Sequence, residues 1–192
     1  MTQEQLHCIF TNPPSLSTDR LLLRKITPED ASDMFLYSRL DEVTRYLLWD
    51  AHPSEEYTRS YISYLQERYA TGDFYDFGVV LKETGRMIGT VGFTSFDLPN
   101  NSAEVGYVIS PFHQGKGFAT EALKKVISFG FDVLGLSRIS AVCMQENSAS
   151  LRVMEKCGLK REGLLRSAVF AKGDMKDVYL SAITEKDYFN LI

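Results

Sequence analysis

The sequence predicts an α/β protein built around a mixed β-sheet. Extended apolar segments separated by turn residues fill much of the first hundred positions, which is typical of paired strands. After residue 104 strands alternate with helices, and the clearest helix runs through residues 119–133 with one apolar face. Strand pairs followed by alternating strands and helices predict a mixed sheet flanked by helices.

Capping residues indicate where the helices of the first half begin. Thr27 is the expected N-cap of the first helix, with Pro28 at its first position and Asp30 as a shorter capping-box acid. Ser54 is the expected cap of a second helix, which ends at Gly72. Strands are predicted over residues 21–26, 75–81, 87–96, 104–109, 137–144, 164–171 and 175–183.

One more helix and the domain bounds complete the predicted organisation. Asn147 is the expected N-cap of a short helix that stops at Gly158. Residues 1–15 are expected to form an irregular lead-in, and residues 16–192 a single domain. A chain of 192 residues is large enough to bury roughly 70% of its unfolded surface in one core.

The composition argues against several classes of function. A net charge of −4, a pI near 5.4 and the absence of a Lys/Arg run argue against a nucleic-acid surface. No apolar run approaches the roughly 20 residues that span a bilayer, so no membrane segment is expected. The cysteines number three, which is odd, so they do not suggest a disulfide framework. They fit a reducing cytoplasm. The isolated histidines predict no metal site.

The hexapeptide of residues 114–119 lies between the strand of residues 104–109 and the long helix. Gly115 and Gly117 let the backbone approach a ligand closely because they carry no Cβ. The first-turn amides of a helix have no intrahelical acceptors, so this order of elements predicts an anion site suited to a pyrophosphate. The loop lacks the third glycine of a dinucleotide fingerprint and the Gly-Lys-Ser/Thr of a P-loop. A connection without a ligand is the alternative for the hexapeptide alone.

A family resemblance rests on this loop and on three further segments. Gln114, Gly117 and Ala119 occupy the fixed positions of the (Gln/Arg)-x-x-Gly-x-(Gly/Ala) motif, which resembles that of GNAT-type N-acetyltransferases. Residues 18–24, 103–107 and 147–159 resemble the RimJ/RimL branch (ribosomal-protein N-terminal acetyltransferase-like). The resemblance implies a GNAT acyl-CoA N-acyltransferase fold, whose central mixed sheet splays to hold acetyl-CoA, with no metal.

The resemblance also implies the residues of the cofactor and acceptor sites. Asn147 would contact the pantetheine arm, and Ser150 would approach the CoA sulfur. Trp49, Glu104 and Tyr107 are expected to contact the acceptor. The predicted cofactor-binding residues are Val108, Ile109, Gln114, Gly115, Lys116, Gly117, Phe118, Ala119, Thr120, Asn147 and Ser150.

Acetyl transfer to an amine needs a neutral amine, donors for the developing oxyanion and a proton for the leaving thiolate. Glu104, which begins the strand before the loop, is the candidate catalytic base, acting directly or through water. A solvated or lysine-paired acid is its structural alternative. Ser150 is the candidate partner of the thiolate, because Met154 stands where the resemblance places a catalytic tyrosine.

Two further positions bear on the chemistry. Val169 stands where some ribosomal-protein acetyltransferases carry a glutamate base, which weakens that assignment. Cys143 aligns with a cysteine near the thioester in some relatives. It is nevertheless expected to act as a small buried side chain rather than as an acyl-carrying nucleophile.

The predicted function is acetyl-CoA-dependent acetylation of a primary amine in a ternary complex. The acceptor would be a small amine, a polyamine, an amino acid or a protein N-terminus, and a homodimer is compatible with the sequence. Two alternatives stay open. One is a non-catalytic acetyl-CoA-binding or regulatory module with the same fold, and the other is a nucleotide-binding protein that uses the glycine loop.

Overall fold

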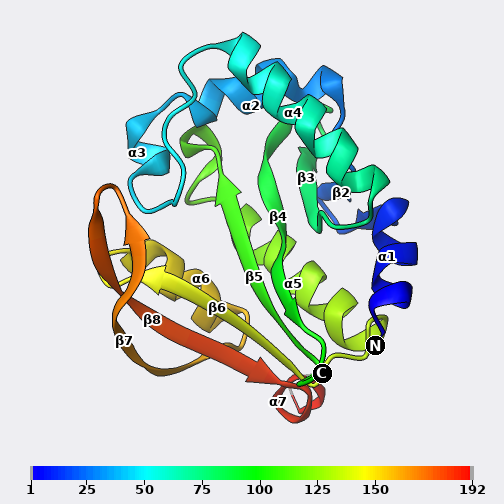
Figure 1. Ribbon diagram of the computed structural model, residues 1–192, viewed down its shortest axis with the longest axis vertical. Coiled ribbons are helices and arrows are strands. Elements are labelled where there is room, and N and C mark those ends of the chain that lie inside the picture. Colours follow the sequence, from blue (N-terminus) through cyan, green and yellow to red (C-terminus); the bar gives the residue numbers. More distant parts are fainter. Residues whose placement is uncertain (1, 191–192) are drawn as a thin grey trace.

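The computed structural model describes residues 2–190 and contains one eight-stranded sheet, in the order β1-β2-β3-β4-β5-β6-β8-β7 (Figure 1). Strands β5 and β6 are parallel, and every other neighbouring pair is antiparallel, so the predicted mixed sheet is confirmed. The strands are β1 (Leu16–Ser17), β2 (Leu21–Arg24), β3 (Asp76–Leu81), β4 (Met87–Asp97), β5 (Ser102–Ile109), β6 (Arg138–Met144), β7 (Lys160–Ala171) and β8 (Asp174–Thr184).

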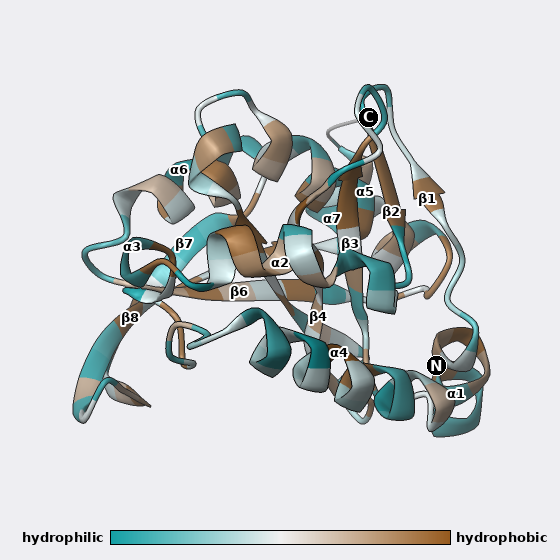
Figure 2. Cartoon of the chain, turned by 90° about the horizontal axis from the view of Figure 1, so that it is seen from above, coloured by the Kyte–Doolittle hydropathy of each residue, from teal (hydrophilic) through white to brown (hydrophobic). Residues whose placement is uncertain are grey.

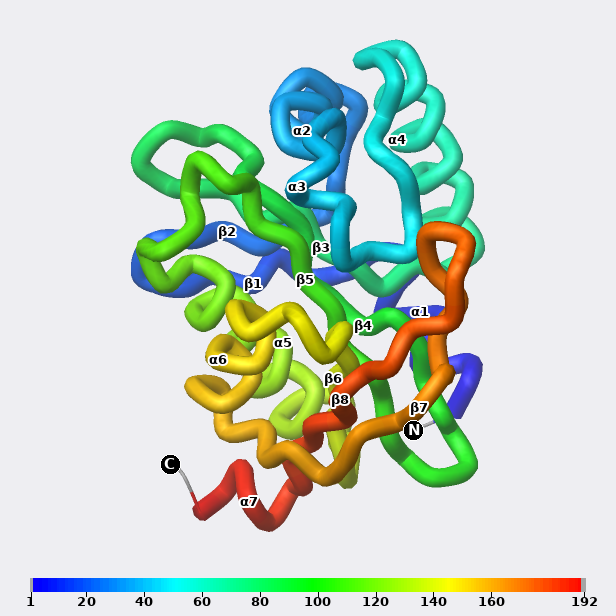
Figure 3. The backbone as a smooth tube through the Cα atoms, turned by 90° about the vertical axis from the view of Figure 1, so that its left-hand side faces the viewer, coloured from blue at the N-terminus to red at the C-terminus, as the bar shows by residue number. Residues whose placement is uncertain are grey.

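Helices cover both faces of the sheet. Helices α5 (Phe118–Asp132) and α6 (Ser148–Lys156) lie on one face, and α2 (Ala31–Ser38) and α4 (Glu55–Ala70) lie on the other (Figures 1 and 3). The remaining helical segments are α1 (Gln3–Thr11), α3 (Asp41–Thr44), α7 (Glu185–Phe189) and the 3-10 turns η1 (Pro28–Asp30) and η2 (Pro111–His113).

Each covered face has its own hydrophobic core. Leu123 and Phe129 of α5 pack with Phe77 of β3 on one face. On the other face Ile62 of α4 packs with Val80 of β3. Hydrophobic residues concentrate in the strands and the inward sides of the helices, whereas much of β7 and the outside of α4 are hydrophilic (Figure 2). This separation is what fixes the orientation of the amphipathic helices on the sheet.

The sheet opens between its two parallel strands. Residues 102–104 of β5 pair with residues 138–140 of β6, and the pairing ends at Glu104 and Ser140. From there β6 pairs only with β8, while β5 continues along β4 (Figure 1). The result is a splayed sheet in which the second half of β5 has a free edge toward β6.

The N-terminal segment corrects one expectation. Residues 1–15 were expected to be irregular, but α1 occupies Gln3–Thr11. Thr2 and Gln5 form a reciprocal capping box, which satisfies two amides at the helix start. Leu6 and Phe10 are fully buried in the core that α5 covers. An apolar pair one helical turn apart therefore fixes this segment to the domain.

The capping residues of the internal helices are confirmed. Asp30 accepts a hydrogen bond from the backbone of Thr27 at 2.8 Å. The Ser54 hydroxyl accepts from the amide of Tyr57 at 3.1 Å. The short elements β1, α3 and α7 were not predicted, and β7 begins at Lys160 rather than at residue 164. The early part of β7 is mostly exposed, so it lacks the apolar alternation that marks a strand in sequence.

Candidate active site

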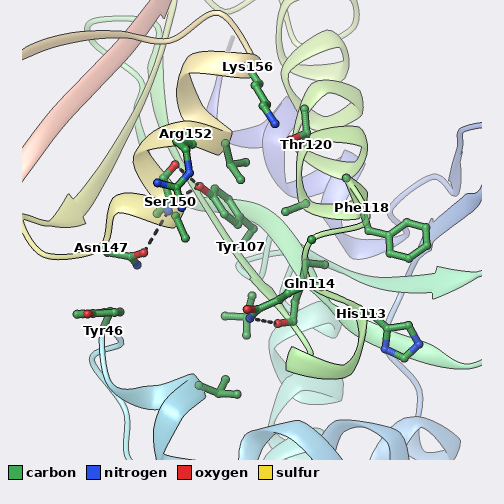
Figure 4. Close-up of a pocket in the computed structure, with 18 of the residues that line it drawn as sticks. Tyr46, Tyr107, His113, Gln114, Phe118, Thr120, Asn147, Ser150, Arg152 and Lys156 are labelled. Carbon is green, nitrogen blue, oxygen red and sulfur yellow. Dashed lines mark hydrogen bonds between the residues drawn. The ribbon is translucent and has the colours of Figure 1, made fainter.

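A cavity of about 410 Å³ lies beside the second half of β5 (Figure 4). Its walls come from the glycine loop with the start of α5, from the start of α6, from β5 and from α3 with the residues that follow it. All the predicted cofactor-binding residues except Lys116 line it, together with Tyr107. The other lining residues are Glu42, Val43, Tyr46, Leu47, His113, Ala149, Arg152, Val153 and Lys156.

The glycine loop presents free backbone amides to this cavity. Gly115 and Gly117 adopt φ of +74° and +83°, the left-handed region in which a side chain is strained. The amides of residues 115–120 make no hydrogen bond to another described backbone group. The side chain of Gln114 turns back and donates to the carbonyl of Ile109 at 3.0 Å (Figure 4). These amides are therefore available to an anion at the N-terminus of α5.

An ion pair anchors the loop from outside the cavity. The Glu121 carboxylate accepts from the Arg20 guanidinium at 2.7 Å and from the Thr18 hydroxyl at 2.6 Å. Arg20 also donates to the carbonyl of Lys116 at 3.0 Å and lies 4.4 Å from the ring centroid of Phe118. The negative charge of Glu121 is thus neutralised close to the helix N-terminus that would receive an anion.

Ser150 belongs to a hydroxyl pair at the inner end of the cavity. Its amide donates to Oδ1 of Asn147 at 3.1 Å, so Asn147 is the helix cap and lines the cavity as well. The Tyr107 hydroxyl lies 2.7 Å from Oγ of Ser150 and donates to the Ser150 carbonyl at 3.0 Å (Figure 4). Burial raises the pKa of Tyr107 well above its usual range, so this phenol stays protonated.

Cys143 lies close to this pair. The side chain is buried, as expected, and burial raises the pKa of its thiol while the neighbouring Ser150 side chain opposes the rise. A thiol with a raised pKa is a poor nucleophile at neutral pH. The structure therefore favours packing over acyl transfer as the role of Cys143.

Glu104 lies on the opposite face of β5 from Tyr107. The two residues are three positions apart on one strand, and successive side chains alternate between faces. Its carboxylate accepts from the Thr94 hydroxyl at 3.1 Å and does not line the cavity. Glu104 is also the last residue of β5 that pairs with β6, so it lies at the point where the sheet opens.

Trp49 and Lys116 lie outside the cavity. The Lys116 ammonium donates to the carbonyl of Phe112 at 3.3 Å. Trp49 packs on His52, with ring centroids 5.4 Å apart, and its carbonyl accepts from Lys172 at 2.6 Å. Lys172 belongs to the tip of the β7–β8 hairpin, which reaches the segment after α3 (Figure 3). The predicted acceptor wall at Trp49 is therefore next to the hairpin tip.

Of the four tyrosines on α4, only Tyr69 is buried. Tyr57, Tyr61 and Tyr64 are exposed, and the rings of Tyr57 and Tyr61 lie 4.9 Å and 5.5 Å from that of His52. His52 is itself buried and bonded through Nδ1 to the Thr58 hydroxyl at 2.8 Å.

A second, more open depression adjoins the cavity. It shares Gly117, Thr120 and Lys156 with the cavity and adds Lys124 and Lys125 of α5. These lysines gather only when α5, α6 and the β1–β2 turn are brought together, so no local sequence motif reveals them. Three ammonium groups beside a helix N-terminus are suited to binding phosphate groups.

Some classes of site find no support in residues 2–190. That part of the chain holds no cluster of three or more His, Cys, Asp or Glu side chains placed to bind a metal ion. None of its helices combines the length and apolar character needed to cross a bilayer.

Comparisons with known proteins agree with this fold. The family model for an acetyltransferase (GNAT) domain matches residues 20–160. The uncharacterized N-acetyltransferase YoaA of Bacillus subtilis is 40% identical over 172 residues, which cover 90% of this chain and 97% of that protein.

Two solved structures have the same fold. A GNAT-family acetyltransferase from Bacillus anthracis is 29% identical, with a TM-score of 0.81 over 90% of this chain and 99% of that one. The spermidine N-acetyltransferase of Vibrio cholerae, in complex with CoA and spermine, is 25% identical. Its TM-score is 0.76, over 90% of this chain and 100% of that one.

Proposed function

Because the chain belongs to the GNAT family of N-acetyltransferases, we propose that it transfers the acetyl group of acetyl-CoA to a primary amine within a ternary complex. One observation carries the proposal. The cavity places a loop of free backbone amides at one end and the Ser150–Tyr107 hydroxyl pair at the other. That arrangement suits a long ligand with a phosphate anion at one end and a reacting thioester at the other.

The cofactor would lie along the face that α5 and α6 cover. The amides of residues 115–120 would hold the pyrophosphate, and the ammonium groups of Lys124, Lys125 and Lys156 would meet the phosphate of the adenosine end. The pantetheine arm would pass Asn147 and enter the opening beside β5. A structure of a GNAT-fold relative holds CoA, which supports the choice of ligand.

The chemistry is direct displacement at the thioester carbonyl. The neutral amine attacks the carbonyl carbon, the C–N bond forms, the C–S bond breaks, and CoA leaves as a thiolate. Ser150 donates its hydroxyl hydrogen to the developing thiolate, and Tyr107, protonated at neutral pH, shifts its own donation to Oγ of Ser150. Glu104 accepts the proton released by the amine, through water, from the other face of β5.

Three finer assignments belong to the same proposal. The Asn147–Ser150 pair at the start of α6 supports membership of the RimJ/RimL branch, with the acceptor entering from the side of α3. Residues 16–192 would form the catalytic domain. The three cysteines, all free thiols, suit a reducing cytoplasm. The rival function, a module that binds acetyl-CoA without turning it over, is opposed by the half-buried hydroxyl pair, which pure binding does not need.

Thiol release from acetyl-CoA with a panel of amines tests the proposal, and Glu104→Gln tests the base. The variant is expected to lose on the order of 10²–10⁴-fold in turnover while acetyl-CoA affinity stays the same. Glu83→Gln, at an exposed turn between β3 and β4, is the matched control. A wild-type protein that binds acetyl-CoA and acetylates no amine would establish the non-catalytic module instead.

A further inference from the structure

We propose that the acceptor carries a second positive charge and that Asp76 binds it, which makes the acceptor a small aliphatic diamine or polyamine. The proposed site lies on the face of the sheet beneath α2 and α4, between Asp76 of β3 and Glu104 of β5. This inference rests on the proposed acetyl transfer and names the substrate class of that reaction.

Asp76 is an acid without a partner. Its carboxylate makes no hydrogen bond and no ion pair with another residue in the described part of the chain, and burial alone raises its pKa to about 7. The residue nevertheless keeps part of its surface accessible. A carboxylate that lies deep in the fold, is reachable from solvent and lacks a cation is suited to a cationic ligand.

Two glycines form the floor between the acids. Asp76 pairs with Gly92 of β4, and Gly92 pairs with Gly106 of β5, so the three residues face the same side. Oδ1 of Asp76 lies 2.4 Å from where a Cβ on Gly92 would stand, so the carboxylate leans across β4. A Cβ on Gly106 would meet only one described atom within 4 Å, Cγ2 of Thr94 at 2.8 Å. Apart from the Thr94 methyl group, no described atom lies within 4 Å of that point.

Two tyrosines lie beside the acid. Tyr37 of α2 is only 2% exposed, and neither its hydroxyl nor that of Tyr61 hydrogen-bonds to a residue that the structure describes. Burial, followed by the charge of Asp76, raises the pKa of Tyr61 to about 12. Burial, then Tyr61 and Asp76, raises that of Tyr37. Phenol rings and unpaired hydroxyls around one carboxylate match the surroundings that bind an alkylammonium.

The position of Glu104 sets the shape of the acceptor. Glu104 and Gly106 lie on the same face of β5, so Glu104 is one step beyond the glycine floor. Strand spacing places the Cα atoms of Asp76 and Glu104 roughly 12 Å apart, and their side chains shorten the span. A diamine can thus present one neutral nitrogen near Glu104 and hold the other, as ammonium, at Asp76. A free amino acid would bring its carboxylate toward Asp76, and the repulsion between the two carboxylates disfavours it.

The test compares three acceptors of similar length with acetyl-CoA: 1,4-diaminobutane, n-butylamine and 4-aminobutanoate. The wild-type protein is expected to prefer the diamine, by kcat/KM, over both others. Asp76→Asn should raise KM for the diamine about tenfold or more and leave kcat for it nearly unchanged, while KM for n-butylamine moves less than twofold. Glu83→Gln removes the same charge from an exposed turn and should change none of these values.

Calorimetry in the presence of CoA separates this inference from the acetyl transfer itself. The wild-type protein should bind 1,4-diaminobutane at least tenfold more tightly than Asp76→Asn does, whether or not an amine is acetylated. Equal kcat/KM for the three acceptors, an Asp76→Asn variant with unchanged diamine KM, or better turnover of N-terminal peptides than of diamines would each overturn the inference. Circular dichroism of Asp76→Asn establishes that the variant is folded.

Discussion

The hydroxyl pair of Ser150 and Tyr107 brings together residues from a helix and a strand. Met154, about two turns from the Asn147 cap, is buried and offers no proton. The phenol that contacts Ser150 comes instead from β5, on the strand side of the cavity. Both residues were predicted as site residues, but Tyr107 was expected to contact the acceptor, because alternation along a strand does not tell which face meets which helix.

Ser150→Ala is expected to lower kcat about tenfold or more with little change in KM for acetyl-CoA, since the hydroxyl matters as thiolate charge develops. Tyr107→Phe should lower kcat about fivefold, which corresponds to a hydrogen bond of about 1 kcal/mol. If the two hydroxyls act in series, the double variant should resemble Ser150→Ala alone. Ser148→Ala, exposed on the same helix, is the control, and additive losses in steady-state kinetics would contradict the relay.

Asp76 is predicted to destabilise the unliganded protein at neutral and alkaline pH. Its carboxyl pKa is about 7 in the folded state and near 3.9 when unfolded, so the folded state binds the proton more tightly. Unfolding free energy from this group therefore falls as pH rises from about 4 to about 7. Glu104, Tyr37, Tyr61 and Tyr69 are the titratable groups that face it.

Asp76→Asn should accordingly raise the melting temperature at pH 8 and leave it unchanged at pH 4. The gain should be on the order of 1–2 kcal/mol, because solvent still reaches the carboxyl. Asp73→Asn is the matched control, because Arg68 and Thr71 lower the pKa of that neighbouring acid, so its removal brings no gain. A variant that melts no higher than wild type at pH 8 would show that the charge of Asp76 is compensated.

At the scale of the elements, the glycine loop depends on backbone conformation more than on space. A Cβ on Gly117 would meet only the Arg20 guanidinium, at 3.4 Å, but φ of +83° strains any side chain there. Gly117→Val is therefore expected to shift the loop and raise the acetyl-CoA dissociation constant at least tenfold, about 1.4 kcal/mol. Gly85→Val has a similar φ of +69° in an open turn and serves as the control for strain alone. If Gly117→Val and the wild-type protein bound acetyl-CoA with equal affinity in calorimetry, the pyrophosphate would not bind at this loop.

Elements with local signals were predictable, and those that depend on distant partners were not. The caps at Thr27, Ser54 and Asn147 act within three residues, so their sequence pattern is sufficient. Helix α1 carried a similar capping signal, but its stability comes from burying Phe10 among aromatic rings of β3, β4 and α5. The composition of a short segment does not reveal such long-range packing.

At the scale of the whole molecule, most residues that line the cavity beside β5 could be predicted from sequence, and the proposed acceptor site could not. Most of the predicted cofactor residues belong to two short segments, the glycine loop and the start of α6. The proposed acceptor residues lie on β3, β4, β5, α2 and α4, and only the register of three strands brings Asp76 to Gly106. Register follows from the packing of the whole sheet, which a single sequence does not specify.

The opening of the sheet also has a mechanical consequence. Strands β1–β5 form one block and β6–β8 another, and only three residue pairs join them across the sheet, compared with seven between β6 and β8. Under a pulling force this short junction would rupture first, and the second block would peel away before either block lost its own hydrogen bonds. A ligand seated in the opening touches both blocks, so it would carry part of the load. The ligand-bound protein would then withstand pulling forces that separate the two blocks of the ligand-free protein.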